Sequence, residues 1–142
     1  MPSKITAPLP VAIKTPESEK ITINMGFVDL GHVDLLVAEG FYSNRTDFIR
    51  TAIRTHLATH ADVLRQAASR KMLVLGLQSF SAADLEAVRA AGETLQIRVL
   101  GLAVIAPDVS AALAKATIDS LTVLGALHAS PAVKAALAGR IR

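Results

Sequence analysis

The chain has 142 residues, enough for one ordinary domain or two small ones, and 51% of them are apolar. Fifteen Lys and Arg against twelve Asp and Glu give a net charge of +3, too mild an excess to indicate a nucleic-acid partner by itself. The absence of cysteine excludes disulfides and thiolate metal sites. No apolar run suits a signal peptide, and the longest, Val99–Ala106, falls far short of the roughly 20 residues that span a bilayer. We therefore expect a soluble, cytoplasmic protein without a membrane partner.

Residues 1–19 contain four prolines and scattered lysines, and offer little apolar surface to bury. Proline interrupts helices, so the segment is predicted to be a flexible N-terminal arm. Two interpretations remain for it: a tail without a role, or a basic arm that reaches along DNA through Lys4 and Lys14.

The segment Lys20–Met25 alternates strictly between polar and apolar residues, which is typical of a strand with one buried face. No second strand follows at hairpin distance, and a lone strand leaves its backbone donors and acceptors unpaired. Pairing with the same strand of a second copy, antiparallel about a two-fold axis, would satisfy them. The sequence therefore predicts a homodimer. The buried face would carry Ile21, Ile23 and Met25, and the free face Lys20, Thr22 and Asn24.

Two helices are predicted to follow this strand. The first would begin with Asp29 as its N-cap and end at Gly40, because glycine accepts the left-handed conformation that closes a helix. The second would begin with Ser43 as its N-cap. Its pattern is compatible with a continuous helix to about Arg70 and equally with a break near His60. The apolar stripes of the two helices comprise Leu30, Val33, Leu36, Val37, Phe48, Ile49, Ala52, Ile53 and Leu57.

A strand followed by two helices, joined by a Gly-x-x-Ser-Asn-Arg-Thr-Asp turn, resembles the ribbon-helix-helix DNA-binding family. The resemblance lies in Ile21–Met25 and Gly40–Arg50 and covers under a third of the chain. It implies an intertwined dimer whose two-stranded ribbon enters the major groove of double-stranded DNA, where base pairs show distinct donor and acceptor patterns. It also implies that the helix N-termini bind phosphates, as their free amides favour anions. The implied base contacts are Lys20, Thr22 and Asn24, and the implied phosphate contacts are Ser43, Asn44 and Arg45.

From Lys71 onward a short motif recurs three times. Val74–Leu77, Val99–Leu102 and Val123–Ala126 begin 25 and 24 residues apart, and a helix-start signal follows each. This period predicts three stacked strand–helix units with a parallel sheet, although a compact α/β domain with a coincidental repeat remains the alternative. The repeated glycine is expected to let a helix or a neighbouring backbone approach closely. The third unit is as apolar as the others, so one end of the stack is expected to meet another copy. The helix-start signals are Ser81–Asp84, Asp108–Ser110 and Ser130–Pro131.

Metal and enzyme chemistry receive little support. His56 and His60 have the i, i+4 spacing of two metal ligands, but no cluster of acidic residues completes a site, and we expect no metal and no cofactor. His32 and His128 are isolated. The chain lacks a nucleophile-turn motif, a phosphate-binding glycine loop and a His-Glu-x-x-His motif, so we expect no enzyme.

Together these patterns predict an α+β protein. Its parts would be the arm at 1–19, a ribbon-helix-helix domain at 20–70 that dimerises and binds DNA, and an oligomerising strand–helix repeat module at 71–142. The favoured function is sequence-specific transcriptional regulation, most often repression, by a nucleoid-associated dimer or higher oligomer. Three alternatives stay open: an architectural DNA-binding protein, an antitoxin, and a self-assembling filament or scaffold.

Overall fold

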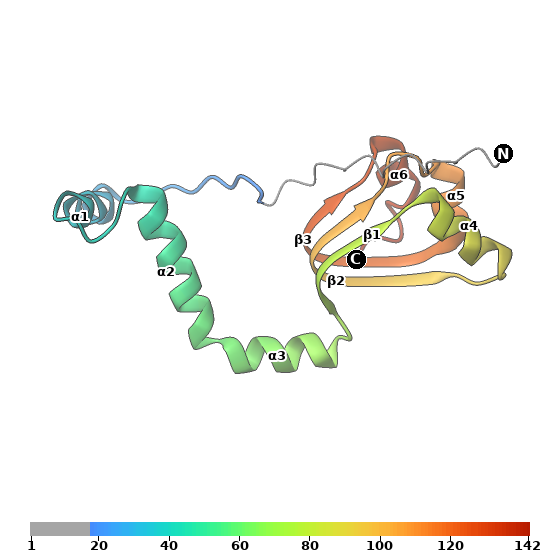
Figure 1. Cartoon of the computed structure of the whole chain (residues 1–142), viewed down its shortest axis with the longest axis horizontal. Coiled ribbons are helices and arrows are strands. Elements are labelled where there is room, and N and C mark those ends of the chain that lie inside the picture. Colours follow the sequence, from blue (N-terminus) through green and yellow to red (C-terminus); the bar gives the residue numbers. More distant parts are fainter. Residues whose placement is uncertain (1–17) are drawn as a thin grey trace, which may run out of the picture. The chain divides into compact units, whose positions relative to one another are not determined.

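The computed structural model describes residues 18–142, so most of the predicted N-terminal arm, with Lys4 and Lys14, lies outside the described residues. The described chain forms two compact units: Lys20–Arg70, and Lys71–Arg142 together with residues 18–19 (Figure 1). Within residues 18–142 no helix is long and apolar enough to cross a membrane.

The first unit contains helices α1 (Phe27–Ala38), α2 (Arg45–Thr59) and α3 (Ala61–Arg70). The N-cap of α1 is Gly26, and Asp29 lies in the first turn, so the predicted N-cap at Asp29 was wrong. An acidic residue in the first turn still complements the helix dipole.

The end of α1 is a Schellman motif. Gly40 has φ +84°, and the amide of Phe41 donates to the carbonyl of Leu36 at 3.0 Å. This pattern satisfies carbonyls that the last helical turn leaves free. The predicted stop at Gly40 is confirmed.

The helical region after Gly40 breaks at His60. Its φ of −106° and ψ of 11° leave the helical range, and its amide bonds the Leu57 carbonyl at 3.0 Å. That three-residue spacing is a tighter turn than the α-helix has. Two separate helices, α2 and α3, therefore replace the single long one that the pattern also allowed.

The predicted strand at Lys20–Met25 is not formed in the single chain, where these residues belong to neither helix nor sheet. A strand needs a hydrogen-bonded neighbour, and the described part of the same chain supplies none here. Ile21 is 73% exposed and Ile23 59%, so two of the three residues predicted to be buried are exposed, while Met25 is partly buried. The ribbon stays a prediction for the dimer.

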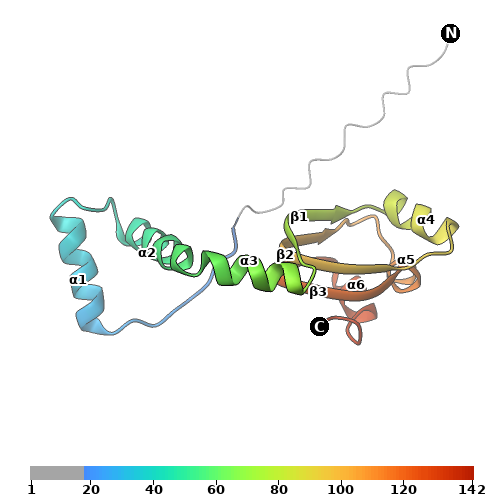
Figure 2. The same cartoon turned by 90° about the horizontal axis from the view of Figure 1, so that it is seen from below.

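The second unit contains the three strand–helix pairs predicted from the repeat. Its strands are parallel in the order β1-β2-β3, with β1 at one edge (Figure 2). Val74 pairs with Val99, which pairs with Val123, so equivalent repeat positions stand side by side. The elements are β1 (Val74–Phe80), α4 (Ala82–Ala90), β2 (Leu95–Ile105), α5 (Ala111–Thr117), β3 (Ile118–His128) and α6 (Pro131–Ala136).

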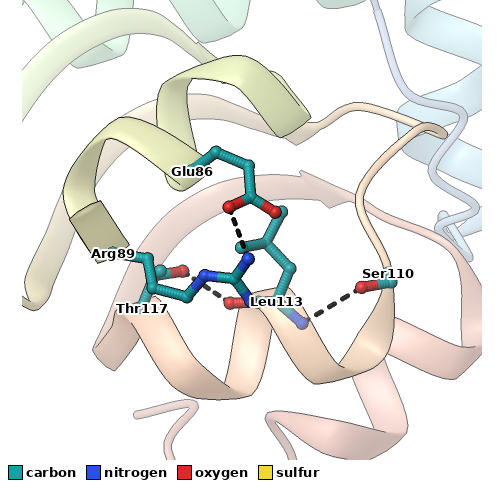
Figure 3. Close-up of polar contacts among 5 residues, drawn as sticks. All are labelled: Glu86, Arg89, Ser110, Leu113 and Thr117. Atoms are coloured by element: carbon teal, nitrogen blue, oxygen red, sulfur yellow. Dashed lines mark hydrogen bonds and ion pairs between the residues drawn. The ribbon is translucent and has the colours of Figure 1, made fainter.

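A serine N-cap begins each helix of this unit, as the sequence predicts. Ser81 and Asp84 form a reciprocal capping box, and Ser130 precedes Pro131 at the first helical position. In α5 the hydroxyl of Ser110 accepts from the Leu113 amide at 3.1 Å (Figure 3). Each cap satisfies an amide that the first turn would otherwise leave free.

The core lies between one face of the sheet and the three helices. Alternate residues of β2 point into it, because successive strand side chains face opposite sides. The other face is also apolar but open: Leu75 is 80% exposed, and its register neighbours on β2 and β3 are Leu100 and Leu124. The core includes Leu85, Ile97, Val99, Ala103, Ile105, Leu113, Ala114, Ile118, Leu121, Val133 and Leu137.

A row of three glycines crosses the sheet. Gly76, Gly101 and Gly125 are register partners with φ of +111°, +139° and +121°, which disfavours any residue with a Cβ. A Cβ on Gly101 would overlap the Gly76 carbonyl, and one on Gly125 would overlap the Gly101 carbonyl. The predicted close backbone approach is therefore confirmed. The backbone that approaches each of these two glycines is that of the preceding strand in the sheet.

We expect Gly76→Ala to destabilise the second unit by about 1–2 kcal/mol through the positive φ alone. Gly101→Ala should cost more, because the Gly76 carbonyl must also move. Urea denaturation of the full chain measures both. Gly139→Ala is the matched control, since its added Cβ meets nothing within 4 Å. Equal losses for Gly76→Ala and Gly101→Ala would contradict the close-approach explanation.

Candidate nucleic-acid interface

The side chains predicted to read bases are exposed. Lys20, Thr22 and Asn24 lie on the segment before α1, and within the described part of the chain none of them forms a hydrogen bond or ion pair with another side chain. The chemistry suits base edges: an amide can pair with adenine, a hydroxyl or its methyl can contact thymine, and an ammonium can donate to guanine.

The residues predicted to hold phosphate come together at the start of α2. Asn44 is the N-cap, and its side-chain oxygen accepts from the Asp47 amide at 2.8 Å. In return the Asp47 carboxylate accepts from the Ser43 amide at 2.9 Å. The predicted N-cap at Ser43 was thus one residue early, because the Asn44–Asp47 pair has the spacing that a capping box requires.

Arg45 makes a contact that the sequence did not reveal. Its guanidinium binds Asp34 of α1 with two hydrogen bonds, Nε to Oδ1 at 2.7 Å and an Nη to Oδ2 at 2.8 Å. The hydrogen bond from Arg45 lowers the pKa of the Asp34 carboxyl, and the same bond raises the pKa of Arg45. Both side chains are about half exposed. The pair fastens the start of α2 to α1, and it gives Arg45 an internal partner that a phosphate would have to share or replace.

Within Lys20–Arg70 the apolar side chains find little cover. Val33 is the one large apolar residue of this unit that is fully buried. Beside it is a recess of about 310 Å³, whose lining includes Met25, His32 and Phe48. Tyr42 packs edge-on against Phe48 at 5.0 Å between ring centroids, which anchors the turn before α2. The exposed large apolar residues of this unit are Ile21, Ile23, Phe27, Val28, Leu35, Phe41, Ile53, Leu57, Val63 and Leu64.

His56 and His60 lie edge-on with ring centroids 5.2 Å apart, at the break between α2 and α3. Among residues 18–142 no group of three or more His, Asp or Glu side chains is placed to hold a metal ion.

Comparison with protein families gives a match over most of the chain. A model of the "Ribbon-Helix-Helix transcriptional regulator family" matches residues 16–134, which include the whole first unit and the second unit as far as Lys134. Neither the curated proteins nor the solved structures contain a significant match to the chain.

The Arg45–Asp34 pair predicts a pH-dependent stability. Because folding lowers the pKa of Asp34, the pair stabilises the fold above the carboxyl's unfolded pKa, and this contribution disappears as the pH falls through the folded pKa. Asp34→Asn should therefore lower Tm at neutral pH, and the difference from the unaltered protein should vanish in acid. Thermal melts across pH measure this.

Asp62→Asn is the control, since Asp62 contacts Arg65 at 3.4 Å on an exposed helix surface. We expect a smaller effect from it because such surface pairs contribute little. A Tm loss for Asp34→Asn that stayed constant down to strongly acidic pH would be inconsistent with this role for the ion pair.

Proposed function

The chain belongs to the ribbon-helix-helix transcriptional regulator family, and we propose that it is a sequence-specific DNA-binding regulator that represses transcription by occupying an operator. The observation that supports this proposal most strongly is the family match, which covers the ribbon segment, the first unit and the second unit as far as Lys134. The role is not enzymatic, and it is exercised in the cytoplasm, on the nucleoid.

In this proposal two copies pair their Lys20–Met25 segments into an antiparallel ribbon that enters the major groove. Lys20, Thr22 and Asn24 read bases. The alternation in the sequence supports this, because it gives the ribbon one polar face of three consecutive alternate residues. Their exposure and lack of side-chain partners in the described chain are consistent with it.

The start of α2 then binds phosphates through Ser43, Asn44 and Arg45. The Asn44 and Asp47 side chains already accept from the Asp47 and Ser43 amides, but the other first-turn amides have no intrahelical acceptor, and the helix dipole favours an anion there. The Asp34 carboxylate supports a positioning role for Arg45, since a guanidinium held by two hydrogen bonds is already ordered before DNA arrives. These contacts fix register and orientation and carry no base information.

Dimerisation is supported by the exposed apolar surface of Lys20–Arg70. A unit with one fully buried large apolar residue has little hydrophobic stabilisation of its own, and a second copy would cover what remains open. Residues 71–142 are proposed to link copies further. Two linked ribbons would occupy adjacent sites at a raised effective concentration, without any better base contact.

Fluorescence anisotropy tests the proposal, with labelled DNA from upstream of the gene and scrambled DNA at two salt concentrations. The protein should prefer the upstream DNA. The double variant Thr22→Ala/Asn24→Ala should lose that preference and retain weak, salt-sensitive binding, because its phosphate contacts remain.

Thr94→Ala, an exposed loop change in the second unit, is the control and should leave both affinities unchanged. Equal affinity of the unaltered protein for both DNAs would favour the architectural alternative. Binding to neither DNA would overturn the DNA-binding proposal itself.

A further inference from the structure

Strand β1 lies at a free edge of the sheet, but its composition is typical of a strand that pairs on both sides. From Leu73 to Phe80 it carries neither a charged residue nor a proline. Exposed edge strands normally use such residues to prevent pairing with another chain. Leu75 is 80% exposed and Leu77 59%, and both lie on the open, apolar face of the sheet. Figure 2 shows β1 at the edge, with its outer side uncovered within this unit.

The opposite edge of the same sheet is different. The C-terminal residues lie against the beginning of β3: the amide of Leu121 donates to the Arg140 carbonyl at 3.0 Å, and the amide of Arg142 donates to the Leu121 carbonyl at 2.9 Å. Arg140 is anchored in turn through its guanidinium to the Ile118 carbonyl at 2.7 Å. The edge formed by β3 is therefore partly occupied by the C-terminal segment, whereas the edge formed by β1 is open within this unit.

This asymmetry bears on how copies can associate. A stack growing head to tail would place β1 of one copy against β3 of the next. In the register that aligns the glycines, residue 72 of the incoming chain would stand opposite residue 121, where the C-terminal segment already pairs. The capped edge thus disfavours an open filament and leaves β1 as the edge for pairing. Pairing of β1 with itself closes after two copies.

We propose that β1 pairs antiparallel with β1 of a second copy about a two-fold axis, joining the two sheets into one. Charge supports this orientation. Lys71 and Arg98 lie at the start of β1, where Arg98 reaches the Lys71 carbonyl at 3.4 Å. Asp84 and Asp108 lie just beyond its end, both contacting the Ser81–Ala82 turn. Antiparallel pairing brings the basic end of each strand to the acidic end of the other.

A groove beside the edge adds apolar surface to the same interface. It has a volume of about 400 Å³ and runs along β1 and the first residues of β2, with Met72, Phe80 and Leu95 among its lining residues. Partner side chains that extend past the paired strands would find an apolar surface there.

This inference rests on the association proposed above for residues 71–142 and specifies its geometry. Because its test requires no DNA, a failure of β1 pairing can be told apart from a failure of the DNA-binding proposal. The chain has no cysteine, so a single introduced one reports contacts directly. Leu77→Cys, treated with a short bismaleimide, should form cross-linked dimers at least about tenfold faster than Ala87→Cys on exposed helix α4, because pairing raises the local concentration.

Two second-site changes separate edge pairing from packing of the open sheet faces. Adding Leu75→Lys to Leu77→Cys should reduce cross-linking to the Ala87→Cys rate, because a charge on the edge opposes pairing. Leu124→Lys is the matched control: Leu124 is on the same face in register with Leu75, but on the far strand. It should leave cross-linking unchanged. The proposal is overturned if Leu77→Cys reacts no faster than Ala87→Cys, or if Leu124→Lys abolishes the cross-link as Leu75→Lys does.

Discussion

Burial of apolar surface is the constraint on which the first unit depends. The unit Lys20–Arg70 exposes ten large apolar side chains, while Val33 is its one large apolar residue that is fully buried. Secondary structure is specified locally, by the Gly40 stop, the Asn44–Asp47 cap and the break at His60. Tertiary stability is not specified locally, because short helices depend on packing against other elements for their stability. In the proposed dimer the second copy would supply that packing, which would couple folding to dimerisation.

The second unit meets the same constraint by repetition. Each strand–helix unit is too small to bury its own apolar face, and stacking three of them creates one core. The glycine row allows this stacking, because Gly101 and Gly125 each present a bare Cα to the glycine carbonyl of the preceding strand. Two polar contacts stabilise the helices over this core (Figure 3). On α4, near α5, the Arg89 guanidinium donates to the Glu86 carboxylate at 2.6 Å. On α5, the Thr117 hydroxyl donates to the Leu113 carbonyl at 2.7 Å.

The sequence predicted what is locally encoded. The period from Val74 to Val123 yielded three parallel strands, and serine caps marked each following helix start. Near α2 it placed the cap at Ser43, because Ser and Asn are equally good caps and only backbone geometry distinguishes them. It missed the Arg45–Asp34 pair, since the two residues lie eleven positions apart on different helices and no periodicity links them. It also missed the C-terminal cover of β3. Lys20–Met25 forms no strand in one chain, because the described residues supply no neighbouring strand, and the proposed ribbon requires a second copy.

The ribbon is the central claim, and amide hydrogen exchange of the DNA-free protein, resolved by residue with NMR, tests it most directly. In a two-stranded antiparallel ribbon, alternate amides are hydrogen-bonded across the pair. We therefore expect every second amide from Lys20 to Met25 to exchange slowly, with protection approaching that of the helix interiors. The alternation would also identify which face carries Thr22 and Asn24. If all amides of this segment exchange at the rate of an unstructured peptide, no ribbon forms and this account of the dimer is wrong.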